Sequence, residues 1–204
     1  LIFHPKAVPQ ELRENIQFIS AHDDIPLDIG RAEIVAGAPL ERQVHELGLL
    51  RGSWPWWDYV LMDPAMNRIF DCYRNTLRGE ASQFGPVSMQ MIDLRYHAAT
   101  IARLCSGAAA QSFTREVESL IRAWNKSVAE SLNKIIELAD SADSAVGMKS
   151  FNSDLARKAN AMSCPAQTLR AKMLNYQRVR KIFQRFGVED AIDNTPLLRK
   201  LLRC

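Results

Sequence analysis

The sequence lacks the motifs that usually identify an enzyme or a cofactor site. Its nine glycines all stand alone, which excludes a glycine-rich phosphate loop and a dinucleotide-binding fingerprint. The four histidines are scattered, and none belongs to the two-histidine helical motif of zinc peptidases. His22-Asp23-Asp24 resembles the paired His-Asp of metal phosphohydrolases. That chemistry needs further histidines and aspartates on helices, and none is suitably spaced here, so a solvated turn is favoured. We therefore predict no metal and no cofactor.

Cysteine pairs at metal-binding or redox spacing are also absent. The four cysteines, at positions 72, 105, 164 and 204, are separated by 33, 59 and 40 residues. Cys72 and Cys105 fall within apolar helical patterns, where a free thiol behaves as a small core residue. This favours a reduced, intracellular and cytoplasmic setting, although two disulfides in a secreted protein remain an alternative. No apolar run exceeds a few residues, so we expect no membrane-spanning helix and no membrane partner.

Patterns typical of β-structure are missing too. Apolar and polar residues do not alternate convincingly over five or more positions, and no Asn-Gly or Asp-Gly hairpin turn occurs. Apolar residues instead recur at helical spacing, in a chain that is 47% hydrophobic and has the material for a sizeable core. The sequence predicts an all-α fold, either a multi-helix bundle or an orthogonal helical array.

Two regions of the chain differ in regularity. Five prolines divide residues 1–62, which we predict to be an irregular, proline-rich N-terminal arm. Residues 63–204 are predicted to be a helical core that ends in a basic C-terminal region, with both regions in one domain. Asp63-Pro64 marks a helix start, because an acidic cap precedes a first-turn proline. The expected helices cover about residues 9–19, 40–50, 63–79, 86–105, 112–139, 154–162, 164–187 and 197–202, with a polar loop at 140–152.

An aromatic cluster closes the N-terminal arm. Trp54, Trp56, Trp57 and Tyr59 lie within six residues of one another. Aromatic rings stack on nucleic-acid bases and dominate protein interfaces, so these four residues are candidates for partner binding. Each ring also buries a large area, which favours the alternative that the cluster anchors the arm to the bundle.

Positive charge is concentrated near the C-terminus. Residues 166–204 contain nine basic and three acidic residues, a net charge of +6, whereas the rest of the chain carries −3. On the helix predicted from residue 164, Arg170, Arg178, Lys181 and Arg185 fall within about 80° of one another, with no acid between them. Lys172 and Arg180 fall in the apolar arc and are expected to extend their charged ends from it. The four cations are candidates for nucleic-acid binding; an acidic protein partner and a plain solvated face are the alternatives.

One helix carries the residue types of a catalytic site. Asp93 and His97 are four residues apart and are expected to touch. Cys105 lies about 12 Å farther along the helix, too far to pair with His97 as nucleophile and base. A surface ion pair and a core thiol are therefore favoured over catalysis.

The segment Arg178–Gly187 is similar to the basic, aromatic C-terminal helices of some RNA-virus coat proteins and nucleoproteins. The similarity covers ten residues of 204 and transfers no residue roles. With the charge asymmetry, it predicts a non-catalytic, self-assembling helical protein that binds single-stranded RNA, nucleocapsid- or coat-like, with a virion as a further location. The N-terminal arm would then hook a neighbouring subunit of a homo-oligomer. The alternatives are a helical adaptor or effector that binds another protein through its tryptophans, and an enzyme with an unrecognised site around His97 or Cys105.

Overall fold

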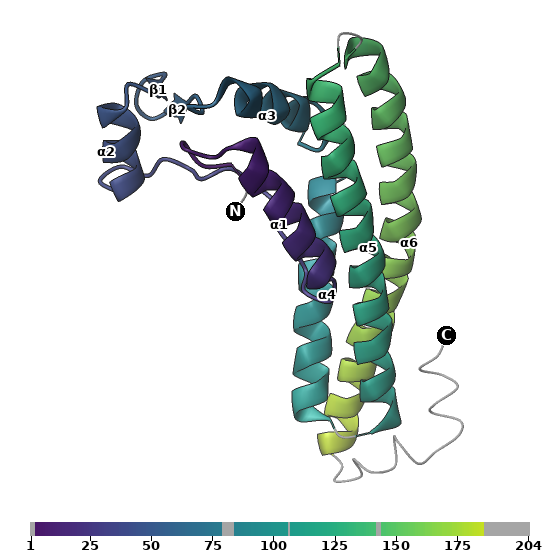
Figure 1. Ribbon diagram of the computed structural model, residues 1–204. Helices are drawn as coiled ribbons and strands as arrows, with labels where there is room; N and C mark the ends of the chain where they lie inside the picture. The colour runs from purple at the N-terminus through teal and green to yellow at the C-terminus, as the bar shows by residue number, and fades with distance from the viewer. Residues whose placement is uncertain (1–2, 79–83, 106, 142–143, 186–204) are drawn as a thin grey trace. The chain divides into compact units, whose positions relative to one another are not determined.

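A computed structural model describes residues 3–78, 84–105, 107–141 and 144–185 (Figure 1). The all-α prediction is confirmed, since these residues form six helices and one short hairpin. The elements in chain order are α1 (Pro9–Ala21), α2 (Pro39–Glu46), β1 (Leu50–Arg51), β2 (Asp58–Tyr59), α3 (Pro64–Thr76), α4 (Phe84–Leu104), α5 (Ala108–Ala139) and α6 (Ser144–Arg185). In the described part of the chain, no helix is both long enough and apolar enough to cross a membrane.

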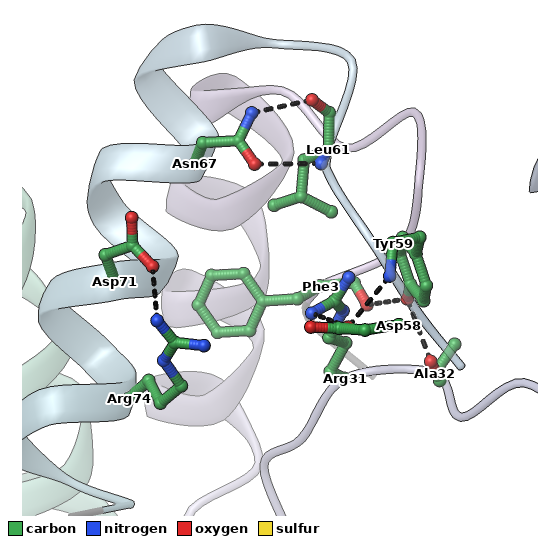
Figure 2. Close-up of polar contacts among 9 residues, drawn as sticks. All are labelled: Phe3, Arg31, Ala32, Asp58, Tyr59, Leu61, Asn67, Asp71 and Arg74. Atoms are coloured by element: carbon green, nitrogen blue, oxygen red, sulfur yellow. Dashed lines mark hydrogen bonds and ion pairs between the residues drawn. The ribbon is translucent and has the colours of Figure 1, made fainter. Parts of the chain in front are cut away.

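The predicted helix start at Asp63 is confirmed. The Asp63 carboxylate accepts hydrogen bonds from the backbone N–H groups of Ala65 and Met66, at 2.7 and 3.1 Å. These are two of the donors that a helix N-terminus leaves without an intrahelical partner. Asn67 then pairs through both atoms of its amide with the backbone of Leu61, which fixes the chain between β2 and α3 (Figure 2).

The predicted loop at 140–152 is too long, since residues 140–141 follow α5 outside any helix but α6 begins at Ser144. The predicted helix break at Cys164-Pro165 is wrong, because α6 runs unbroken from Ser144 to Arg185. Pro165 removes one backbone donor, but both Pro165 and Ala161 are exposed, so water can hydrate the carbonyl that loses its partner. A buried stripe continues across the proline and holds both halves in one helix. Its residues are Leu155, Ala159, Ala166, Leu169, Met173 and Tyr176. The predicted helix end at Gly187 and the helix at 197–202 lie outside the described residues.

The chain divides into two compact units, here called the N-terminal unit (residues 1–22, 28–85 and 126–156) and the three-helix unit (residues 23–27, 86–125 and 157–204). In the N-terminal unit, Phe3 is fully buried and its ring lies 4.9 Å from Tyr73 and 5.1 Å from Phe70, centroid to centroid. The N–H of Ala32 donates to the Phe3 carbonyl at 3.1 Å. Residues of the predicted N-terminal arm therefore pack against other parts of their own chain. The predicted boundary between arm and helical core at residue 62 stays a prediction.

The three-helix unit consists of most of α4, the first part of α5 and the second part of α6. Its core centres on Trp124, whose indole N–H donates to the hydroxyl of Ser88 at 3.1 Å while both side chains are buried. The amide of Asn125 donates to the carbonyls of Asp23 and Ile25, at 2.9 and 2.7 Å, and so fixes the turn predicted there. Side-chain contacts from Gln90 to Ser163 and from Asp93 to Arg170 align α4 and α6 in parallel.

Candidate functional site

The C-terminal end of α6 carries exposed cations. In Figure 1 this end lies beside the C-terminal end of α4 and the N-terminal end of α5. The rings of Phe113 and Tyr176 fix that arrangement, with centroids 5.5 Å apart. Five exposed cations lie within about two turns of these three helix ends, and we call them the basic end. They are Arg103, Arg115, Arg178, Lys181 and Arg185.

Three of the four residues predicted to bind nucleic acid belong to the basic end. Arg178, Lys181 and Arg185 are exposed, and no carboxylate of the described ranges pairs with them. They span eight residues of helix, or about 10 Å along its axis. Arg103 and Arg115 are likewise unpaired among the described residues, and they come from helices that sequence analysis did not connect with this face. Lys172 and Arg180 are half-buried, as their place in the apolar arc predicts.

Arg170, the fourth predicted residue, has an acidic partner. Its Nε donates to Asp93 Oδ2 on α4, and Asp93 Oδ1 lies 3.4 Å from His97 Nε2. The expected contact between Asp93 and His97 is therefore present, but the carboxylate also neutralises part of the Arg170 charge. A helical wheel of α6 alone cannot reveal this partner, because Asp93 is on another helix.

Cys105 is buried, as predicted, and no disulfide joins Cys72, Cys105 and Cys164.

The tryptophan cluster forms the loop of the β1–β2 hairpin, in which Leu50 pairs with Tyr59 and Arg51 with Asp58. Trp54 and Trp56 are 65% and 83% exposed, so the interpretation of the tryptophans as buried anchors is wrong for these two residues. The rings of Trp54 and Trp57 contact edge to face, 5.2 Å apart. Tyr59 is only 3% exposed and is the residue that anchors the hairpin.

The hairpin loop depends on Gly52. Its φ is +76°, a backbone conformation that side chains with a Cβ rarely adopt. A Cβ at this position would lie 2.4 Å from the carbonyl oxygen of Trp56, well inside van der Waals contact. Glycine is therefore needed here both for its conformation and for its lack of a side chain, and it determines where Trp54 and Trp56 are presented.

A pocket of about 730 Å³ lies beside this hairpin, within the N-terminal unit. We call it the arginine–tryptophan pocket, since three arginines and two tryptophans line it together with other aromatic and acidic residues. Its principal lining residues are Arg31, Arg74, Arg78, Trp56, Trp57, Tyr59, Phe70, Tyr73, Asp28, Glu33 and Asp58. Of these residues, only Trp56, Trp57 and Tyr59 are predicted from the sequence to bind a partner.

Arg31 is the most enclosed charge in the pocket, with a side chain 14% exposed. Figure 2 shows its guanidinium beside Asp58 and Tyr59. Its Nη1 lies 2.6 Å from Asp58 Oδ1, and its central carbon lies 3.7 Å from the Tyr59 ring centroid and 4.7 Å from that of Phe70. Such cation–π contacts stabilise a desolvated guanidinium. Nε and Nη2 are buried and have no hydrogen-bond acceptor in the described structure.

Arg78 and Tyr73 form a second polar group in the pocket. Arg78 donates to the Tyr73 hydroxyl, to the Ile29 carbonyl and to Asp28, at 3.0, 2.6 and 2.9 Å. The Tyr73 hydroxyl in turn donates to the Ile29 carbonyl at 2.6 Å. Burial raises the pKa of Tyr73, and the nearby Arg78 opposes this by a smaller amount. The hydrogen bond with Tyr73 is the main reason that the pKa of Arg78 is raised, so both groups keep their protons at neutral pH.

Comparisons with protein-family models, with curated proteins and with solved structures find no match for this chain. The function is therefore inferred from the residues of this chain alone. Among the described residues, no group of three or more histidine, cysteine, aspartate or glutamate side chains is arranged to hold a metal ion.

Proposed function

We propose that the chain is a non-catalytic, self-assembling helical protein that binds the backbone of single-stranded RNA through its basic end. The observation that supports this most is the group of Arg178, Lys181 and Arg185, exposed on one ridge of α6 and without a described acidic partner. When a protein cation binds a phosphate, counterions are released from the nucleic acid. A cation that has no ion pair within the protein can do this without breaking a contact in the folded chain. Arg103 and Arg115 are exposed near the ends of α4 and α5 that lie beside this end of α6.

Backbone binding of this kind depends on salt. Each phosphate neutralised on a single strand contributes about −0.7 to the slope of log K against log salt concentration. Three cations on α6 therefore predict that about −2 of the total slope is lost when they are removed. Binding is expected to be indifferent to RNA sequence, because contacts to phosphate carry no base information.

A charge-reversal series tests the proposal. The variant Arg178→Glu/Lys181→Glu/Arg185→Glu is compared with Arg13→Glu/Arg42→Glu/Lys149→Glu, which reverses three exposed cations outside the basic end and changes the net charge equally. RNA affinity is measured by fluorescence anisotropy at several salt concentrations, and helicity by circular dichroism. The first variant is expected to lose binding and the second to keep most of it. Equal binding by both variants would remove the support for the basic end.

A second candidate function is recognition of another protein through the hairpin. It is favoured by one observation, the exposure of Trp54 and Trp56, because large aromatic side chains are the most common binding hot spots at protein interfaces. In a self-assembling protein, the partner would be a second copy of this chain. Replacement of both tryptophans by serine would then lower the oligomeric state without loss of helicity.

A further inference from the structure

The arginine–tryptophan pocket is formed by residues between 28 and 78, all in the N-terminal unit. It shares no residue with the basic end, which belongs to the three-helix unit. Its volume of about 730 Å³ falls within the range of about 300–1,000 Å³ that is typical of small-molecule sites. The lining combines guanidinium groups with indole and phenol rings. This combination suits a ligand that has both an anionic group and a flat ring.

The pocket is lined by three guanidinium groups and three carboxylates, of which Glu33 has no ion pair among the described residues. Nε and Nη2 of Arg31 have no acceptor among the described residues, and Arg74 has a single carboxylate partner, Asp71, which does not line the pocket. The arginines therefore favour a ligand that brings acceptors. A phosphoryl group supplies three strong acceptor oxygens and matches the fork of N–H groups on a guanidinium.

Two carboxylates that line the pocket are already engaged by arginines. Asp28 pairs with Arg78 at 2.9 Å and Asp58 with Arg31 at 2.6 Å. These pairs hold the guanidinium groups in place before a ligand arrives, and an exchange of partners lets an incoming phosphate share them. Arg74 is about half-exposed and bonds only to Asp71, so it is the cation most accessible to a ligand.

The same pocket contains aromatic rings that are suited to stacking on a flat ligand. Trp56 is 83% exposed and Trp57 is half-buried, so their indole surfaces are not fully used by the protein. Every nucleobase presents a flat face to an indole, and such stacking contributes about 1–3 kcal/mol per base. Trp54 lies on the same hairpin but does not line the pocket.

We propose that the arginine–tryptophan pocket binds a nucleoside phosphate, either free or as one nucleotide of an RNA strand. Arg74 and Arg78 hold the phosphate, Trp56 and Trp57 stack on the base, and Arg31 adds positive charge from the interior. The inference goes beyond the proposed function, since it concerns another set of residues and does not require the basic end to bind RNA.

The test is a titration of the full chain with AMP and GMP, followed by quenching of tryptophan fluorescence. Trp124 is buried in the three-helix unit, so the ligand-dependent quenching comes mainly from the hairpin tryptophans. Adenosine and inorganic phosphate, each lacking half of the ligand, are expected to bind at least tenfold more weakly than AMP. A short oligoadenylate distinguishes a free nucleotide from a nucleotide within a strand.

Two variants and two matched controls connect the signal to the pocket. Arg74→Gln and Trp56→Ser alter exposed side chains and are expected to fold. Each should weaken AMP binding by about tenfold or more in isothermal titration calorimetry, which is used because Trp56→Ser also removes a fluorescent ring. Arg42→Gln and Trp54→Ser remove an exposed arginine and an exposed tryptophan outside the pocket, and they should bind as the unaltered chain does. If only oligoadenylate binds, and Arg74→Gln and Trp56→Ser abolish that binding, the nucleotide is taken from a strand.

Three results would overturn the proposal: no saturable quenching by mononucleotide or oligonucleotide, unchanged binding by Arg74→Gln and Trp56→Ser, or equally tight binding of phenyl phosphate. The last result would mark the pocket as a site for phosphotyrosine peptides. The basic-end variant Arg178→Glu/Lys181→Glu/Arg185→Glu separates this proposal from the RNA-binding function, because it should bind AMP normally even when it no longer binds long RNA.

Discussion

The guanidinium of Arg31 lies against the ring of Tyr59, with 3.7 Å between its central carbon and the ring centroid. The Tyr59 hydroxyl donates to the carbonyl of Ala32 at 2.9 Å, so ring and hydroxyl both bind the segment that carries Arg31. This pair connects the hairpin to residues 31–32, and through the isolated β-bridge between Arg31 and Phe3 to the N-terminal segment. The stability of the pocket therefore depends on Tyr59, which the sequence alone suggests as a partner-binding residue.

Replacement of Tyr59 by phenylalanine should destabilise the chain by about 1 kcal/mol, because the half-buried carbonyl of Ala32 loses its donor while the ring stays in place. Urea unfolding monitored by circular dichroism measures the change. Tyr96→Phe is the control, since that ring is 69% exposed and its substitution should be nearly neutral. Equal effects of the two substitutions would mean that the Tyr59 hydroxyl contributes nothing.

Substitution of Gly52 by alanine should disrupt the hairpin, because its Cβ would overlap the Trp56 carbonyl oxygen at 2.4 Å. Gly48→Ala is the matched control: its φ is +65°, but no atom lies within 4 Å of the added Cβ. Both substitutions carry the strain of a positive φ, about 1 kcal/mol, and only Gly52→Ala adds a steric clash. We expect Gly52→Ala to be more destabilising and to change the tryptophan emission. Identical behaviour of the two variants would contradict the hairpin geometry.

Replacement of Pro165 by alanine should stabilise the chain, by about 1–3 kcal/mol, because alanine restores a backbone donor inside a continuous helix. The midpoint of urea unfolding is the measurement. Two separate helices joined at residue 165, as the sequence alone suggests, would instead make the substitution neutral or unfavourable.

Stability should fall at alkaline pH. Burial raises the pKa of Cys72 above 9.0 and the pKa values of Tyr59 and Tyr73 above 10.0 in the folded chain. The unfolded chain then loses these protons at lower pH than the folded chain, so their contribution is complete below pH 9 and declines as pH rises through the folded values. Urea unfolding at pH 7, 9 and 10.5 follows the decline. Cys72→Ala should remove the part that begins between pH 9 and 10; an unchanged onset would exclude Cys72 as its source.

Sequence periodicity predicts the helices well where one face is apolar, and α5 is the clearest case, since nearly all of the predicted stripe from Phe113 to Ile136 is buried. It fails at Pro165, because a local rule about proline is weaker than a buried stripe that continues across the residue. The sequence pattern also located Arg178, Lys181 and Arg185 on one exposed ridge.

Tertiary contacts explain what the sequence pattern missed. Arg170 finds Asp93 from a different helix, 77 residues away, and no wheel of α6 contains that information. Arg31, Arg74 and Arg78 meet only because the segment after α1 folds against α3. Tyr59 and the neighbouring tryptophans are chemically similar, yet the hairpin register buries Tyr59 and exposes Trp54 and Trp56.

The most direct test of the proposed function is size-exclusion chromatography with light scattering, with and without single-stranded RNA, at low and at moderate salt. The proposal predicts that protein and RNA elute together in large particles, and that these particles weaken steeply as salt rises. A monomer that elutes identically with and without RNA at both salt concentrations would contradict RNA binding and self-assembly together.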